Sequence, residues 1–243
     1  MGYCQYHPSL YNNLKIQFTG SDRLALSFSQ MHQDLLVLSL LNGKHNGTYL
    51  EIGSHHPIEV NNTYLLESMY KWKGVSFELD PYMSEMFRQK RQNPIIEGDA
   101  LAVDYTKIIQ DNNLGDVIDY LSVDIEPPEG TLKVLKMLPH STVKFRVITF
   151  EHCAGCVPEG PRLREESRKF LSDLGYKLVV PDAGNEVNPG NPDTAISIED
   201  WWYHPDLVDT EFVDLLKVES GLPISSRMTV YNLENTGFYN AQW

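Results

Sequence analysis

Cysteine is rare in this chain, and no long apolar segment is present. Three of the 243 residues are cysteine, an odd number that does not provide the disulfide framework of a small secreted domain. There is no run of about 18 apolar residues, so we expect no transmembrane helix and no membrane partner. Residues 1–6 lack the basic and apolar regions of a signal peptide. Together these absences predict a cytoplasmic protein.

Positive charge is also scarce. The sequence has 20 Lys and Arg against 33 Asp and Glu, which is a formal net charge of −13. Nucleic-acid binding depends on a surplus of basic side chains that neutralise phosphates, so we do not expect a nucleic-acid partner. The rest of the composition, with 42% hydrophobic residues, is typical of a globular protein. The length suits one large α/β domain or two small ones.

Strand-like and helix-like segments alternate along the chain. Strands separated by helices predict an α/β fold with a parallel sheet and helices on both faces. We expect an N-terminal arm and helix over 1–44, a core over 45–205, and a C-terminal extension of the same domain over 206–243. Strands are predicted at 48–52, 74–79, 94–97, 117–125, 145–150, 176–180 and 196–203, helices at 29–41, 62–71, 81–89, 105–110, 130–137 and 163–174, and a surface loop at 181–192.

Three residues at predicted strand ends are suited to an adenosine ligand. In parallel sheets the ligand lies beyond the carboxyl ends of the strands. Gly53 ends the strand over 48–52, and a glycine there lets a ligand approach the backbone. Glu78 ends the next strand, where a carboxylate can accept hydrogen bonds from both ribose hydroxyls. Asp99 follows the third strand and can accept from the exocyclic amine of a purine.

The loop after the first strand distinguishes two adenosine-containing ligands. A dinucleotide favours G-x-G-x-x-G, whereas this loop has His55, His56 and Pro57. The negative charge of Glu51 repels phosphates and suits the ammonium group of a methionine moiety. S-adenosylmethionine therefore fits better than NAD. An NAD(P)-dependent enzyme and a non-catalytic binding protein of the same fold stay as alternatives.

Six motifs occur in a characteristic order over about residues 45–205. Together they resemble the FkbM-like group of class I S-adenosylmethionine-dependent methyltransferases. This resemblance implies a Rossmann-like, mostly parallel seven-stranded sheet with an antiparallel last strand, and methyl transfer to a hydroxyl of a sugar, glycan or other small molecule. The motifs are YLEIG at 49–53, NNTYLLE at 61–67, GVSFELDP at 74–81, GDA at 98–100, DYLSVDIE at 119–126 and VITFEH at 147–152. The cofactor contacts expected on this basis are Glu51, Gly53, Ser54, Asn62, Glu78, Asp99, Ala100 and Asp124.

Acidic residues and a histidine follow the fourth and fifth predicted strands. An acceptor hydroxyl needs a base or a metal to become nucleophilic. Asp124, Glu126 and His152 are candidate catalytic residues of a general-base cluster. Asp124, Glu151 and His152 are alternatively a candidate Mg²⁺ site, since hard cations prefer oxygen ligands. A third interpretation is that Asp124 only holds the cofactor and Glu151 caps the next segment.

Two further motifs are interpreted as structural. His152 with Cys153 and Cys156 supplies only three zinc ligands, and a single C-x-x-C is a weak redox signal, so we expect ordinary loop cysteines. The aromatic run over 201–203 can offer a stacking surface for a sugar, but core packing at the sheet is the favoured interpretation.

Overall fold

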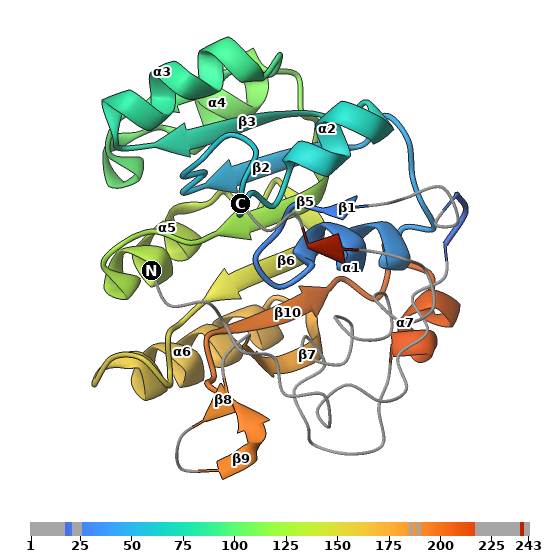
Figure 1. Cartoon of the computed structure of the whole chain (residues 1–243), viewed down its shortest axis with the longest axis vertical. Coiled ribbons are helices and arrows are strands. Elements are labelled where there is room, and N and C mark those ends of the chain that lie inside the picture. The colour runs from blue at the N-terminus through green and yellow to red at the C-terminus, as the bar shows by residue number, and fades with distance from the viewer. Residues whose placement is uncertain (1–17, 21–25, 185–186, 189–190, 217–238, 241–243) are drawn as a thin grey trace.

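A seven-stranded sheet runs through the centre of the computed structural model, which describes residues 18–20, 26–184, 187–188, 191–216 and 239–240. The strand order is β4-β3-β2-β5-β6-β10-β7 (Figure 1). All neighbouring pairs are parallel except those of β10, which is antiparallel to both β6 and β7. The strands are β2 (Thr48–Ile52), β3 (Lys73–Glu78), β4 (Ile95–Glu97), β5 (Val117–Val123), β6 (Lys144–Glu151), β7 (Lys177–Ala183) and β10 (Glu199–Tyr203).

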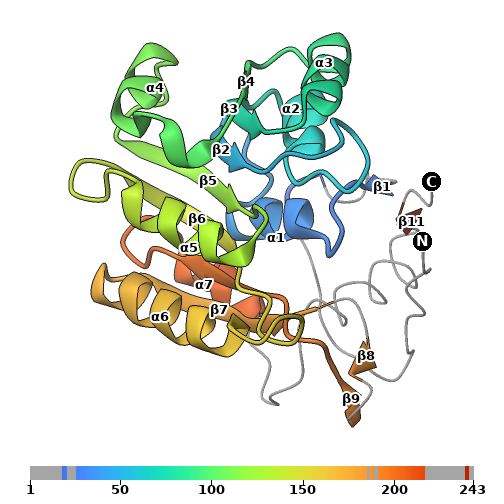
Figure 2. The ribbon, with the colours of Figure 1, turned by 90° about the vertical axis from the view of Figure 1, so that its left-hand side faces the viewer.

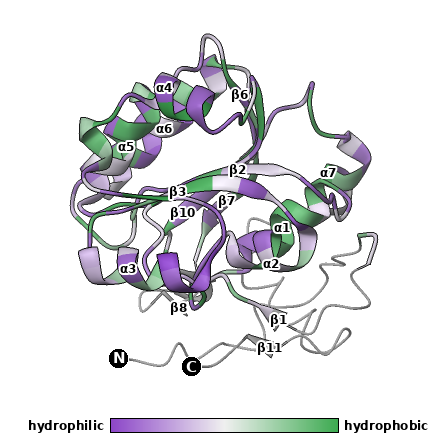
Figure 3. Ribbon diagram, turned by 90° about the horizontal axis from the view of Figure 1, so that it is seen from above, coloured by the Kyte–Doolittle hydropathy of each residue, from purple (hydrophilic) through white to green (hydrophobic). Residues whose placement is uncertain are grey.

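Helices cover both faces of this sheet (Figures 2 and 3). One face carries α1 (Gln33–Leu40), α2 (Tyr64–Tyr70) and α3 (Pro81–Lys90). Helix α7 (Thr210–Leu216) packs against α1 and shares its half of the core. The other face carries α4 (Tyr105–Asp111), α5 (Pro128–Met137) and α6 (Gly160–Asp173). The mostly parallel seven-stranded sheet, its one antiparallel strand and its two helical layers confirm the predicted Rossmann-like α/β fold.

The core has two halves because successive strand residues point to opposite faces. Tyr49 belongs to the half under α1, and the next residue, Leu50, belongs to the half under α4 and α5. Trp201 and Trp202 divide in the same way and are almost completely buried. The aromatic run on β10 therefore packs in the core, as the favoured interpretation has it.

Several predicted boundaries differ from the observed ones. Helix α1 begins at Gln33, not at residue 29, because His32 has a positive φ of 63° and the Asp34 carboxylate instead accepts from the Phe28 N–H. Helix α2 begins at Tyr64, later than predicted, because residues 61–63 form a turn in which the Asn61 side chain accepts from the Thr63 and Tyr64 N–H groups.

The region predicted as a surface loop contains additional strands. Strand β7 continues to Ala183, and β8 (Val187–Asn188) pairs with β9 (Asn191–Ala195). Near the chain ends, β1 (Leu26–Ser27) pairs with β11 (Tyr239–Asn240). Much of the predicted arm and C-terminal extension, residues 1–17 and 217–238, lies outside the described residues. Within the described ranges, no helix has the length and apolar character needed to cross a bilayer.

Candidate functional site

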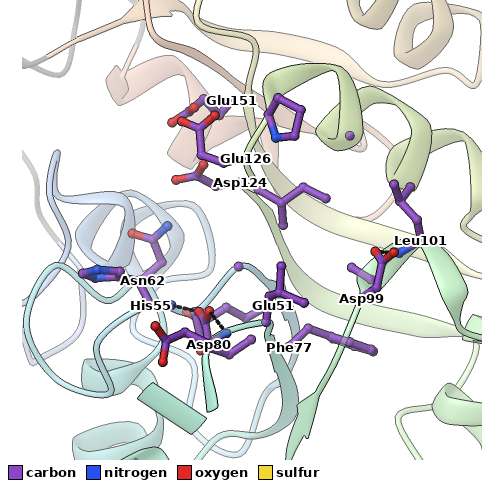
Figure 4. A pocket seen from close by; sticks show the side chains of 18 of the residues that line it. Glu51, His55, Asn62, Phe77, Asp80, Asp99, Leu101, Asp124, Glu126 and Glu151 are labelled. Carbon is purple, nitrogen blue, oxygen red and sulfur yellow. Dashed lines mark hydrogen bonds between the residues drawn. The ribbon is translucent and has the colours of Figure 1, made fainter. Parts of the chain in front are cut away.

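A cavity of about 680 Å³ opens where the carboxyl ends of the parallel strands meet (Figure 4). This is the location expected for the ligand of a parallel α/β sheet. The cavity collects residues from β2, β3 and β6, from the segments that follow β2, β3, β4 and β5, and from α1 and α5. Of the predicted site residues, Glu51, Gly53, Ser54, Asn62, Glu78, Asp99, Ala100, Asp124, Glu126 and Glu151 all line it.

Gly53 is required by the neighbouring strand. Its φ is +88°, a conformation that side chains rarely adopt. A Cβ at this position would overlap the carbonyl oxygen of Asp124, which follows β5. The contact with Asp124 alone therefore requires glycine at this position, whether or not a ligand approaches the backbone here.

Glu78 anchors the backbone on both sides of the end of β3. Its Oε2 accepts from the His55 N–H at 2.6 Å, and its Oε1 accepts from the Asp80 N–H at 2.9 Å. Asp80 in turn caps α3 by accepting from the N–H groups of Tyr82 and Met83. One carboxylate thus sets the path of the loop after β2 and the start of α3. Figure 4 draws the contacts of His55 and Asp80 with this carboxylate as dashed lines.

Exposed apolar side chains flank the acidic strand ends. Leu79 directly follows Glu78 and is 67% exposed, and Leu101 is 37% exposed. Both line the cavity, as does Val60, which is 53% exposed. Asp99 holds the start of the 3-10 helix Ala100–Ala102 by accepting from the Leu101 N–H at 2.8 Å. The sequence analysis did not predict these apolar residues. Leu79 and Leu101 follow the strand-end carboxylates Glu78 and Asp99 by one and two places, and that spacing could have indicated them.

Glu51 lies in a buried hydrogen-bond network beneath the cavity. Its Oε2 accepts from the hydroxyls of Ser76 at 2.7 Å and Thr63 at 3.0 Å. Burial raises the pKa of Glu51, and the nearby Arg91 guanidinium opposes that rise. Asn62, at the edge of the same loop, donates from Nδ2 to the Ser122 hydroxyl at 3.0 Å.

Four carboxyl groups gather at the other side of the cavity. Asp124, Glu126 and Glu151 lie together in Figure 4, and Asp124 hydrogen-bonds Glu151. Glu199 pairs with Glu151 across β10 and β6, and its Oε1 accepts from Gln33 and from the Trp201 indole N–H.

Burial and mutual repulsion favour protonation in this group. Burial, then the Asp124 and Glu199 charges, raises the pKa of Glu151. Burial also raises the pKa of Asp124 and moves that of Glu199 from its usual 4.5 to about 8. Glu151 and Glu199 therefore hold protons at neutral pH, as carboxyl groups that share a buried site do, whereas Asp124, with its pKa raised only to about 6, stays mostly ionised.

The structure does not assemble the predicted metal site of Asp124, Glu151 and His152. Glu151 faces the cavity, whereas the side chain of the next residue, His152, is fully buried elsewhere. His152 Nδ1 accepts from the Ala154 N–H at 3.1 Å, and Nε2 lies 3.5 Å from Asp200. The physical reason is the alternation of side chains along and just past a strand. His152 also does not line the cavity, so the structure does not place it as a base beside the acceptor.

Among the described residues, the group whose ligand atoms come together is His152, Asp182 and Asp200, within 4.8 Å of one another. Arg168 already neutralises it, since its guanidinium contacts Asp200 at 2.7 Å and Asp182 at 3.0 Å. A metal ion would have to compete with that cation. This group therefore functions as an internal ion-pair network.

The two cysteines after β6 lie in one turn. The Cys156 N–H donates to the Cys153 carbonyl at 2.9 Å, and Cys153 is buried while Cys156 is exposed. Burial raises the pKa of the Cys153 thiol, which disfavours thiolate chemistry. This geometry is consistent with the interpretation as ordinary loop cysteines.

Comparison with known proteins gives structural likenesses only. No family model and no curated protein matches the sequence. An O-methyltransferase from Bacillus cereus in complex with SAH shares 12% identity, with 76% of this chain and 86% of that chain covered and a TM-score of 0.48. A protein from Klebsiella pneumoniae provisionally named an O-methyltransferase shares 11% identity, with 82% of this chain and 91% of that chain covered and a TM-score of 0.49. A protein from Clostridium thermocellum provisionally named an rRNA-methylase shares 14% identity, with 74% of this chain and 99% of that chain covered and a TM-score of 0.47. At these values the likenesses carry no information on reaction or substrate.

Proposed function

We propose that the cavity binds S-adenosylmethionine and that the protein transfers its methyl group to an acceptor hydroxyl. The observation that carries the proposal is the charge of the cavity. Among the described residues that line it there is no Lys or Arg. Seven carboxyl groups line it instead, those of Glu51, Glu78, Asp80, Asp99, Asp124, Glu126 and Glu151. Such a lining suits a ligand with a sulfonium and an ammonium group and opposes the pyrophosphate of NAD(P).

The adenosine part of the ligand occupies the side with Glu78 and Asp99. Glu78 accepts from the ribose hydroxyls with the lone pairs that its two backbone contacts do not use. Asp99 accepts from the adenine amine, and the exposed Leu79 and Leu101 side chains cover the faces of the ring. Burying these leucines against the base removes apolar surface from water, which favours binding.

The methionine part lies over the loop after β2, between Gly53 and Asn62. Glu51 beneath this loop and Asp124 beside it provide the negative charge that the ammonium group requires. Ser54 and Ala100 contribute through their positions at the ends of β2 and β4, where the backbone lines the cavity.

The acceptor enters beside Asp124, Glu126 and Glu151. When bound, S-adenosylmethionine supplies an electrophilic methyl group on sulfur. The residues of the chain align the acceptor, exclude water and take the hydroxyl proton on a carboxylate oxygen, while the new oxygen–carbon bond replaces the sulfur–carbon bond. Asp124 and Glu126 are the proposed bases. Because the three-residue metal set is not assembled, no step is assigned to Mg²⁺.

The motifs support placing the chain with the FkbM-like group and an acceptor that is a sugar, glycan or other small molecule. The acidic cavity supports a neutral or cationic acceptor over a nucleic acid.

Isothermal titration of the protein with S-adenosylhomocysteine and, separately, with NAD and NADP tests the cofactor. We expect micromolar binding of S-adenosylhomocysteine alone. Binding of NAD or NADP alone would overturn the proposal. Transfer of labelled methyl groups to a panel of polyols, glycans, amines and RNA then tests the acceptor, and methylation confined to RNA would refute the small-molecule assignment.

A further inference from the structure

Arg91 is a buried cation that the proposed reaction leaves without a role. It follows α3 directly, and its side chain is 1% exposed. Its guanidinium lies 4.6 Å from the centre of the Phe87 ring and contacts Glu67 at 2.7 Å. A buried charge is costly to desolvate. Its contacts therefore indicate which part of the fold the charge serves.

Arg91 also contacts the loop that lines the cavity, in addition to a bond from Nη2 to the Tyr49 hydroxyl at 3.2 Å. Nη1 donates to the Pro57 carbonyl at 2.9 Å and to the Asn61 Oδ1 at 3.0 Å. Asn61 in turn donates from Nδ2 to the Ser54 carbonyl at 3.1 Å. The guanidinium thus holds both ends of the segment 54–61 together, although it does not itself line the cavity.

A second path leads from Arg91 to the floor of the cavity. Nη2 donates to the Thr63 hydroxyl at 3.0 Å, and that hydroxyl donates to Glu51 Oε2 at 3.0 Å. Thr63 is fully buried. The orientation of the Glu51 carboxyl is therefore coupled to Arg91 through one hydroxyl group.

The segment held by Arg91 is conformationally strained. His55 and Val60 both have positive φ values, 49° and 54°. A β-branched residue such as Val60 rarely adopts this conformation, and strain of this kind persists only where surrounding contacts enforce it. Both residues line the cavity. Without the fork of donors from Arg91, this segment would relax and the lining would change.

We propose that Arg91 is a positioning residue that shapes loop 54–63 and Glu51 to receive the amino-acid end of the methyl donor. This inference rests on the proposed function. Arg91 does not contact the adenosine side, where Glu78 and Asp99 bind. Within the segment that Arg91 holds, the His55 N–H reaches Glu78, whereas the contacts with Ser54, Asn61, Thr63 and Glu51 lie on the methionine side. We therefore expect the larger effect on the methionine part of the ligand.

The test compares two ligands that differ only at that end. S-adenosylhomocysteine carries the amino-acid group and 5′-methylthioadenosine lacks it. The Arg91→Lys variant keeps the charge but loses the planar fork of donors. We expect its Kd for S-adenosylhomocysteine to rise at least about tenfold while the Kd for 5′-methylthioadenosine changes less than about threefold. The matched control is Arg88→Lys in α3, the helix that Arg91 follows. Arg88 forms its ion pairs with Glu85 and Glu97 on the surface, so this variant should bind both ligands as the wild type does.

Equal losses for both ligands, or no loss for either, would overturn the role of Arg91. The Thr63→Val variant removes the hydroxyl that joins Arg91 to Glu51 and that also contacts Asn61 Oδ1 at 3.3 Å. It provides the same comparison if Arg91→Lys does not fold. Amide hydrogen exchange of residues 54–63 tests the hold on the loop without any ligand, and it must rise in Arg91→Lys but not in Arg88→Lys. If wild-type protein binds neither ligand, the proposed function fails, while the exchange measurement still decides whether Arg91 positions the loop.

Discussion

Replacement of Glu78 by glutamine examines the proposed adenosine contact most directly. The carboxylate has two oxygens, and each accepts a backbone N–H, from His55 at 2.6 Å and from Asp80 at 2.9 Å. A glutamine has one oxygen and one NH₂ group, so one of these N–H groups must face another donor. The substitution also removes the charge that strengthens any hydrogen bond to the ribose hydroxyls.

The expected loss follows from these contacts. Hydrogen bonds to charged groups contribute about 1.5–3 kcal/mol, against about 1 kcal/mol for neutral pairs. Weakened ribose contacts together with a displaced loop give a loss of roughly 2–4 kcal/mol in binding, which is about a 30- to 1,000-fold rise in Kd. Isothermal titration with S-adenosylhomocysteine measures this directly, and the melting temperature of each variant reports on folding.

The neighbouring strand provides the control. Glu97 lies beside Glu78 in the sheet register, but its carboxylate pairs with Arg88 at 2.9 Å on the surface and does not line the cavity. Glu97→Gln should leave the Kd within about twofold of the wild type, since exposed ion pairs contribute little. If Glu78→Gln is folded and binds S-adenosylhomocysteine within about threefold of the wild type, Glu78 does not contact the ribose and the orientation proposed for the ligand is wrong.

Three further predictions concern stability. Gly53→Ala should destabilise the protein by more than about 2 kcal/mol in urea unfolding, whereas Gly115→Ala, with a similar φ but open space around it, should cost only about 1 kcal/mol; equal losses would contradict the clash with the Asp124 carbonyl. The stabilisation that accompanies the raised pKa of Glu199 is complete below the usual pKa of 4.5 and is lost as the pH rises through about 8. Glu199→Gln should therefore reduce the fall in melting temperature between pH 5 and 9, and an unchanged slope would refute this. His152→Gln should lower the melting temperature and leave the Kd for S-adenosylhomocysteine unchanged; a loss of affinity at unchanged stability would restore His152 to the site.

Local patterns in the sequence determined most elements of the fold and most of the carboxyl groups that line the cavity. Strand β2 was predicted with its observed bounds, Thr48–Ile52, because a short apolar run ending in glycine is a local signal. The same holds for Glu78 and Asp99, since a residue at the end of a parallel strand must lie at the ligand-binding edge of the sheet. These conclusions needed only periodicity, turn residues and strand direction.

The tertiary structure decided how distant segments meet. It placed the side chain of His152 beside Asp200, not beside Glu151, because the direction of a side chain past a strand end depends on the pairing of β6 with β10. It also brought Arg91 under loop 54–63, 30 residues from Asn61 in sequence. No local pattern encodes such a contact, since it arises only when α3 and the loop after β2 pack on the same face of the sheet. The sequence alone thus determined most of the carboxyl groups that border the cavity, whereas packing determined which apolar side chains join them and which buried groups hold them in place.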